Sequence, residues 1–575
     1  MLKRLKSVSM MLFLMGASTG AAYAVSNPGI TDVKIAQQDG ACTGIVKDAT
    51  GETVIGASVV VKGTTNGTIT GIDGDFSLSN VKKGDVIVIS FVGYISQEIV
   101  WDGKPVNVTL KDDTQTLDEV VVVGYGTQKK VNVTGAVGMV DSKVIAARPV
   151  QNVSQALQGV IPGLNLTVGN SGGSLDGEMN INIRGTGTIG DGSGSSPLVL
   201  IDGIEGNLNT VNPNDIESVS VLKDAASASI YGARASFGVI LVTTKSGKSG
   251  KTNVNYSGNV RFNDAIGIPE LMDSYTFAQY FNRASSNRGG GDIFSPAVME
   301  RIKAYQEGTL TATTVDNGSG IWQKWANANG NTDWFGEFYD NWVPSQEHNL
   351  SISGGTEKLQ YVLSGSFLDQ KGLLRHGTDK FQRYTLNSKI TANITDWLKV
   401  TLNSKWTRED FQRPTYLTSS FFHNLARKWP VHPAYDPNGF PMDEGEIEQM
   451  ENGGEQNSQK DYYTNQLHVV IEPIKNWRIN LEGSVRTTTQ YQHWEVLPVH
   501  AYDVNGDPYY TVWDMGYGSY SAGSSRVDEY SWKENYYTTN IYSDYFKQFD
   551  NGHYFKVMAG FNAELYKNRS IEAIP

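Results

Sequence analysis

Residues 386–394 read Leu386-Asn387-Ser388-Lys389-Ile390-Thr391-Ala392-Asn393-Ile394, with apolar or small side chains at even positions and polar ones at odd positions. Successive side chains of a β-strand point to opposite faces, so this stretch predicts a strand with one apolar and one polar face. The same alternation recurs at 478–486 and 554–565. The block 251–575 is therefore predicted to be antiparallel β-structure.

Strand length and connection length favour a membrane barrel over a soluble sandwich, which remains the alternative from periodicity alone. The predicted strands run to about ten residues, the length that a tilted membrane strand requires. Short turns at 354–358, 394–397, 474–477 and 550–553 alternate with long segments at 263–346, 408–462 and 487–531. Outer-membrane barrels have short periplasmic turns and longer outer loops.

The strand count indicates an incomplete barrel. We count about nine strands, the first at 253–262 and the last at 554–566. Barrels that hold a plug have about 22 strands. We therefore expect block 251–575 to be the N-terminal part of such a barrel, with the remaining strands beyond residue 575.

A smaller β-domain is predicted at residues 42–112. Short apolar strands at 44–46, 57–61, 75–78 and 86–91 are separated by glycine-containing turns, a spacing typical of a small β-sandwich. Cys42 is the only cysteine of the chain, so no intramolecular disulfide can form.

The N-terminus predicts export. Lys3, Arg4 and Lys6 precede a short apolar stretch, and Ala22-Tyr23-Ala24 fits a small-x-small cleavage site. Residues 1–24 are thus expected to be a cleaved signal peptide and 25–41 a linker.

Composition and motifs exclude several functions. A net charge of −12 argues against nucleic-acid binding. None of the eight histidines forms H-x-x-x-H, and we expect no cofactor, no metal site and no catalytic constellation. Gly185, Gly187 and Gly190 satisfy G-x-G-x-x-G, but a loop follows where a dinucleotide site needs a helix. The segments beginning at Asp436 and Asp503 lack the distal Glu of a calcium loop and are expected to be turns.

Residues 131–250 mix strands with short helices. The stretches 198–201 and 239–243 are nearly all apolar or β-branched, as in strands buried on both faces. We expect Ser154 and Asp215 to begin helices or turns. Charged residues lie beside the apolar strands and must be paired or solvated, namely Arg184, Lys223, Asp224 and Arg234.

The segment 113–130 holds a four-valine run with polar flanks, Asp118-Glu119-Val120-Val121-Val122-Val123-Gly124-Tyr125. Its β-propensity suits a strand that can be offered to a partner as an added edge strand. Composition alone is also compatible with an internal strand.

These motifs together resemble the SusC/RagA family of TonB-linked outer-membrane proteins. Residues 42–112 resemble a carboxypeptidase regulatory-like domain, 113–130 a linker with a TonB box, and 131–250 a plug domain. The resemblance implies that Asp118 to Tyr125 contact a TonB-type energising protein. It assigns to the plug motif the residues Arg184, Gly185, Asp202, Gly203, Lys223, Asp224, Tyr231, Gly232 and Arg234.

The resemblance implies a mainly β transporter rather than an enzyme, with substrate contacts unknown. It would reside in outer-membrane lipid and import a bulky nutrient, an oligosaccharide or a peptide, with a SusD-like surface lipoprotein. Aromatic residues of the long outer segments, such as Tyr416, Phe421, Phe422, Trp429 and Tyr435, are expected to help form that contact. A stand-alone receptor for a metal chelate or cofactor, and a non-transporting adhesin, are the alternatives.

Overall fold

The computed structural model of the 575-residue chain contains two compact units, Met1–Asp118 and Glu119–Pro575, which are treated separately below. It describes residues 40–48, 51–64, 66–91, 94–111, 120–123, 126–129, 136–148, 150–168, 174–175, 177–185, 196–511, 513–514, 519–520, 522–549 and 553–573. The predicted signal peptide and the glycine loop at 186–190 lie outside these residues.

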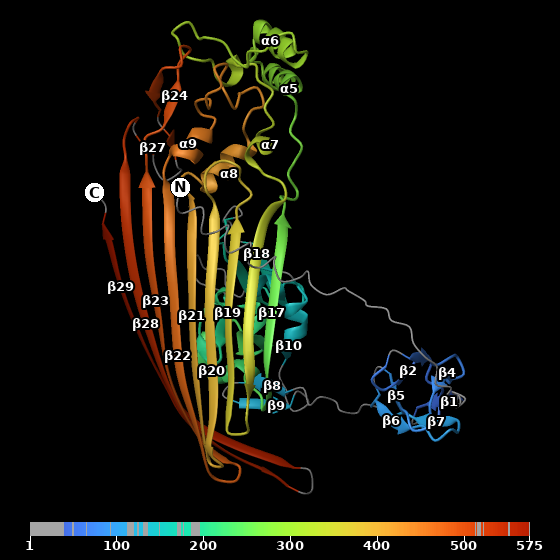
Figure 1. The fold of residues 1–575 in the computed structure, drawn as a ribbon. Helices are drawn as coiled ribbons and strands as arrows, with labels where there is room; N and C mark the ends of the chain where they lie inside the picture. The colour runs from blue at the N-terminus through green and yellow to red at the C-terminus, as the bar shows by residue number, and fades with distance from the viewer. Residues whose placement is uncertain are drawn as a thin grey trace, which may run out of the picture. The chain divides into compact units, whose positions relative to one another are not determined.

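The first unit is the predicted small β-sandwich (Figure 1). One sheet has the order β4-β1-β7 and the other the order β3-β2-β5-β6. Their apolar faces share one core in which Cys42 is buried beside Val59, Phe76 and Ile87. The strands are β1 (Gly40–Lys47), β2 (Ser58–Val61), β3 (Gly67–Ile69), β4 (Asp75–Val81), β5 (Val86–Ser90), β6 (Gln97–Val100) and β7 (Val106–Thr109).

The second unit begins with a two-stranded hairpin and the plug. The hairpin pairs β8 (Val120–Val123) with β9 (Gly126–Lys129). The plug contains β10 (Val137–Asp141), α2 (Ser142–Ala146), α3 (Val153–Leu157), β11 (Leu164–Val168), β12 (Met179–Ile183), β13 (Leu198–Ile201), β14 (Ile204–Glu205), η2 (Leu208–Thr210), η3 (Pro213–Asp215), β15 (Ile216–Leu222), α4 (Ala225–Ala228), η4 (Ser229–Ala235) and β16 (Val239–Thr244).

The plug core is built on a five-stranded sheet of order β10-β15-β16-β13-β14. β13 and β16 pair in parallel and are buried on both faces, as their apolar sequences predict. The two helices begin earlier than predicted, at Val153 and Pro213 rather than at Ser154 and Asp215. Asn152 and Asn212 cap them by accepting hydrogen bonds from the backbone N–H groups of Gln155 and Asn214.

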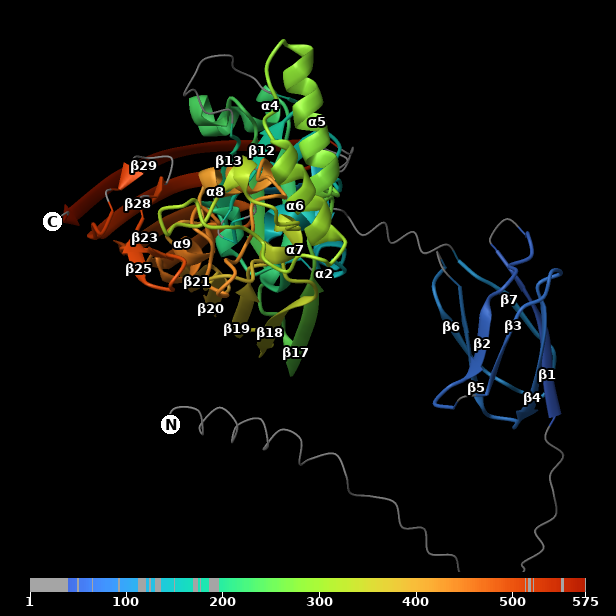
Figure 2. The ribbon, with the colours of Figure 1, turned by 90° about the horizontal axis from the view of Figure 1, so that it is seen from above.

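A nine-stranded antiparallel sheet follows, and its strand order β17-β18-β19-β20-β21-β22-β23-β28-β29 confirms the predicted count. The strands are β17 (Gly250–Asn263), β18 (Val343–Gly355), β19 (Leu359–Lys371), β20 (Lys380–Thr395), β21 (Leu398–Pro414), β22 (Glu455–Ile474), β23 (Trp477–Val496), β28 (Arg526–Gln548) and β29 (Tyr554–Ala573). Several extend beyond their predicted ends, so the long connections are shorter than expected. The sheet curves around the plug (Figure 2).

The two faces of this sheet have the opposite polarity to those of a soluble protein. Leu386 and Ile394 are 57% and 58% exposed, while Asn387 between them in the alternation is 9% exposed. The same inversion holds on neighbouring strands, where Leu402, Leu467 and Leu481 are exposed and the adjacent Asn403, Gln466 and Asn480 are buried. The apolar face points away from the plug and the polar face points toward it.

The long connections form a cap at the end of the sheet opposite the short turns (Figure 1). The cap contains α5 (Ser274–Asn287), α6 (Pro296–Gln306), η5 (Trp325–Asn327), α7 (Trp334–Phe338), α8 (Ser419–Ala426), α9 (Ile447–Asn452), β24 (His500–Tyr502), β25 (Pro508–Tyr510), β26 (Trp513–Asp514) and β27 (Ser519–Tyr520). Among the described residues, no helix has the length and apolar character needed to cross a membrane.

Aromatic residues of the cap mainly build its own cores. Tyr416 and Phe421 are buried in a cluster with Trp334 and Phe338. Phe422 is partly buried against this cluster, and Trp429 is partly buried against a second apolar cluster of the cap. Of the five residues predicted to contact a partner, Tyr435 alone is exposed. The expectation that these five residues face a partner is therefore wrong for Tyr416 and Phe421.

Candidate functional site

The segment predicted to contact the energising protein is a strand in its central part. Val120–Val123 form β8, which pairs with β9 in the register Val120↔Lys129 to Val123↔Gly126. Asp118, Glu119, Gly124 and Tyr125 lie outside the described residues. The hairpin lies below the plug, at the end of the sheet that carries the short turns (Figure 1).

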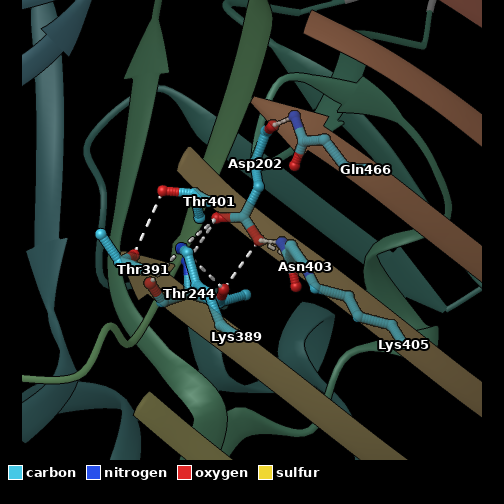
Figure 3. A network of polar contacts seen from close by, with 8 residues as sticks. All are labelled: Asp202, Thr244, Lys389, Thr391, Thr401, Asn403, Lys405 and Gln466. Atoms are coloured by element: carbon cyan, nitrogen blue, oxygen red, sulfur yellow. Dashed lines mark hydrogen bonds and ion pairs between the residues drawn. The ribbon is translucent and has the colours of Figure 1, made fainter. Parts of the chain in front are cut away.

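Asp202 of the plug motif is the centre of a polar network between the plug and the sheet (Figure 3). Its carboxylate accepts hydrogen bonds from Lys389 on β20 at 3.4 Å and, at a shorter separation, from Lys405 on β21. Asn403 on β21 donates to it at 3.0 Å, and Gln466 on β22 donates to its backbone carbonyl at 3.0 Å. Three strands of the sheet thus contact one plug residue.

The backbone places this carboxylate at the end of β13. Asp202 has a φ of 50° and Gly203 a φ of 87°, so a glycine in the second position lets the chain turn directly into β14. Thr244 on the adjacent β16 donates to the same carboxylate from its amide at 2.9 Å and from its hydroxyl at 2.7 Å. Thr244 therefore holds both carboxylate oxygens of Asp202 from within the plug.

The charge of Asp202 is stabilised by its surroundings. Burial alone would raise the pKa of this carboxyl, but the nearby charges of Lys405 and Lys389 outweigh burial and hold its pKa well below its usual range. A buried carboxylate in contact with two lysines is strongly held as long as all three side chains remain.

Arg234 makes a second link to the sheet. Its two terminal guanidinium nitrogens donate to the carboxylate of Glu564 on β29, at 2.6 and 2.7 Å. One of them also donates to Glu205 on β14 at 3.2 Å. Gly232 enables this geometry, because its φ of 65° and ψ of −150° break the 3₁₀ helix just before Arg234. Tyr231 packs against the smaller plug core beside Leu222 and Val239.

Other motif residues hold the plug together. Lys223 donates to the carbonyl of Pro162 at 2.7 Å. Asp224 caps α4, and the hydrogen bonds that it accepts from Ser227 and from the amide of Ala136 lower its pKa to about 2. Each side chain secures an element of the plug against its neighbour.

Arg184 and Gly185 form a turn after β12. Arg184 has a φ of 60° and donates its amide to Gly163 at 2.8 Å. Gly185 has a φ of 98° and donates to Asn182 at 3.1 Å. This turn ties β12 to the end of the loop before β11.

A cavity of about 530 Å³ lies between the plug and the inner face of the sheet. The plug contributes Asn209 and Asn212, and the sheet contributes Asn387, Lys405 and Tyr462. Hydrogen-bond donors and acceptors thus face a space large enough for a small polar solute or several waters.

The aspartate loops of the cap are turns. Asp436 accepts hydrogen bonds from the amides of Asn438 and Phe440, and Asp503 from those of Asn505 and Asp507. Across the described parts of the chain, no group of three or more His, Cys, Asp or Glu side chains is arranged to hold a metal ion.

Comparison with known proteins places these features in a family. Residues 129–239 match the TonB-dependent receptor plug domain, and residues 42–122 match the carboxypeptidase regulatory-like domain. The TonB-dependent receptor SusC of Bacteroides thetaiotaomicron is 37% identical over 375 residues, covering 63% of this chain and 33% of that receptor. A TonB-dependent receptor of Formosa agariphila is 33% identical over 393 residues, covering 68% of this chain and 34% of that receptor.

The chain belongs to the SusC/RagA family of TonB-linked outer-membrane proteins. It spans about a third of the length of the curated relatives that it matches. A solved structure of the RagAB peptide importer in an open-open state shares its fold, with a TM-score of 0.62 and 24% identity over 79% of this chain and 50% of that chain.

The SusC/RagA plug is also held by residues that sequence reasoning missed. Arg383 on β20 is buried and donates to the carbonyls of Asn209 and Gln151 in the plug, at 2.7 and 2.6 Å. Thr407 on β21 donates to the carbonyl of Thr210 at 3.0 Å. Both are polar residues on the inward face of a strand, and their place in the alternation of polar and apolar residues was the only sequence signal that could have indicated contact with the plug.

Proposed function

We propose that this SusC/RagA-family protein imports a bulky nutrient across an outer membrane, with energy supplied through a TonB-type protein. In this role the protein transports its substrate without a catalytic step. The observation that carries it is the inverted polarity of the nine-stranded sheet, combined with a plug domain bound to its polar face.

A sheet of this kind suits lipid on one side and a polar lumen on the other. Exposed leucines and isoleucines on successive strands form a large apolar surface, which a soluble protein rarely leaves uncovered. Membrane strands alternate between apolar residues that face lipid and polar residues that face the lumen. Trp397 and Trp477 lie beside short turns on exposed positions, where we expect them to mark the membrane interface.

The plug would block the lumen until the energising protein acts on the strand before it. We propose that residues Asp118 to Tyr125 are the contact, because an extended four-valine strand can be added to the edge of a partner sheet. Force applied there reaches the plug directly, since β10 begins only a few residues after the hairpin.

For the substrate we propose an oligosaccharide first and a peptide second, delivered by a surface lipoprotein that covers the cap. Membership of the SusC/RagA family supports the lipoprotein. The structural relative is described as a peptide importer, which keeps a peptide substrate among the proposals for this chain. The cavity with amide and hydroxyl groups on both walls is compatible with either polar substrate.

The first experiment is gentle affinity purification of the full-length protein from outer membranes, followed by mass spectrometry of everything retained. A stoichiometric surface lipoprotein supports the covered importer, and a trapped glycan or peptide identifies the substrate class. Reproducible absence of a lipoprotein overturns that model and favours a stand-alone receptor for a metal chelate or cofactor.

Deletion of residues 118–125 separates transport from adhesion. We expect the deletion variant to reach the outer membrane in normal amounts and to lose uptake of the nutrient that supports growth. Unchanged uptake would overturn the proposed coupling, and retained surface adhesion without any uptake phenotype would favour an adhesin.

A further inference from the structure

The segment proposed to contact the energising protein is paired with the residues that follow it. β8 (Val120–Val123) and β9 (Gly126–Lys129) form an antiparallel hairpin with two residues between the strands. Their register matches Val121 with Gln128 and Val122 with Thr127. The strand proposed for the partner is thus already extended before the partner arrives.

The hairpin is a sheet of its own. In the described part of the chain it has two strands, and β9 is the only strand that pairs with β8. The plug strand β15 lies beside β8, and it is already paired on both sides by β10 and β16. One edge of β8 is therefore unpaired among the described strands.

The register decides which backbone groups face that edge. In antiparallel pairs, hydrogen-bonded and non-hydrogen-bonded pairs alternate. In a hairpin with two residues between the strands the flanking pair is hydrogen-bonded, so Val123 pairs with Gly126 in this way, and so does Val121 with Gln128. The backbone groups of Val120 and Val122 then point to the unpaired edge.

We propose that β9 acts as a template strand, which holds β8 extended and presents its unpaired edge to the strand of the energising protein. This proposal rests on the proposed function, because it assumes that β8 is the contact. It adds positioning residues, Gly126 to Lys129, that touch neither the partner nor the substrate.

Thermodynamics favours addition to the open edge over replacement of β9. If the partner displaced β9, the four residue pairs between β8 and β9 would be lost and a similar number would form with the partner, so the net gain in binding free energy would be small. Addition keeps those pairs and forms new ones, and a three-stranded sheet is more stable than an isolated hairpin. A strand that is already extended also loses less conformational entropy on binding.

Proline substitutions at neighbouring positions test the template. Gln128→Pro removes a backbone donor that faces β8, whereas Thr127→Pro, the matched control, removes one that faces away from it. In the full-length protein we expect Gln128→Pro to weaken binding of the purified strand-adding domain of TonB on the order of tenfold. Thr127→Pro should change binding less than about twofold by the same reasoning.

A third variant separates failure of the template from failure of the contact. Val122→Pro removes a donor on the open edge of β8 and should abolish binding if β8 is the contact. Unchanged binding by Val122→Pro would overturn the proposed contact itself. If Val122→Pro abolishes binding while Gln128→Pro leaves it unchanged or tightens it, β9 is a bystander or a competitor and the template is wrong.

Discussion

Replacing Asp202 with asparagine should loosen the plug from the sheet. The substitution keeps the size of the side chain but removes the charge that Lys389 and Lys405 share. Asn403 and Thr244 also lose an ionised acceptor. Because the Asp202 side chain is only 8% exposed, water cannot replace these contacts without opening the interface.

The magnitude follows from the burial of the three charged groups. Removing one partner of a buried ion pair costs about 3–5 kcal/mol, since the remaining charge stays desolvated. Lys405 lines the cavity, where water can partly rehydrate its ammonium group, so we expect a cost near the lower end of this range. A loss of about 3 kcal/mol raises the equilibrium constant for local opening on the order of a hundredfold.

Hydrogen exchange with mass spectrometry measures this opening. In the purified full-length protein, amides of β13 and β16 should exchange on the order of a hundredfold faster in Asp202→Asn than in the wild type. Glu217→Gln is the matched control, because Glu217 lies in the same plug sheet with an exposed side chain. Exchange in the barrel strands away from Asp202 should not change.

A change in exchange of less than about threefold in Asp202→Asn would place this ion pair in the range of exposed pairs and refute the predicted effect of burial. The same increase in Glu217→Gln would refute the assignment of the effect to Asp202. A double variant that adds Lys405→Met removes one of the stranded charges, so it should recover part of the protection that Asp202→Asn loses.

Three further predictions follow from the plug and the cap. Arg234→Ala should destabilise the plug by only about 1 kcal/mol, because its pair with Glu564 is partly exposed and therefore screened by solvent; local hydrogen exchange in η4 measures the change. In the cap, Lys428 and Glu446 form a buried pair at 2.9 Å, so Glu446→Gln should lower the melting temperature of the full-length protein while the double variant with Lys428→Met restores much of it. Burial, together with the charges of Lys428 and Lys324, holds the pKa of His432 well below its usual range. The cap should therefore lose stability as the pH falls below about 6.5, the pKa of an unfolded histidine, toward the lowered pKa. His432→Gln should remove this pH dependence of the melting temperature.

The barrel strands were predictable because their signal is local. Alternation at 386–394 identifies both faces of a strand, and the structure places Asn387 inward and Leu386 outward. The apolar run 198–201 likewise predicted a strand buried on both faces. In each case neighbouring residues carry the information, so no long-range contact had to be known.

Pairings between distant residues were not predictable in this way. Arg383 binds carbonyls of residues 209 and 151, more than 170 positions earlier in the chain, and nothing local distinguishes it from other inward polar residues. The prediction that the cap aromatics contact a partner was wrong for Tyr416 and Phe421 for a related reason. Tyr416 and Phe421 lie in a long polar segment that suggests an open loop, yet they pack with Trp334 from another connection.

The composition of the plug–sheet interface is suited to repeated opening. Several of its contacts are hydrogen bonds from neutral side chains to backbone carbonyls, such as that of Thr407. Water can replace such a bond, so it contributes only about 1 kcal/mol net. Hydrogen bonds from a charged group, such as those of Arg383, contribute about 1.5–3 kcal/mol each. An apolar interface would instead cost about 25 cal/mol for every Å² exposed, over its whole area. If the plug moves as the proposed transport requires, a polar inner face can therefore be exposed to water and be covered again afterwards. The buried charges around Asp202 and at Arg383 are the exceptions, and they concentrate the resistance to opening at a few contacts with β20 and β21.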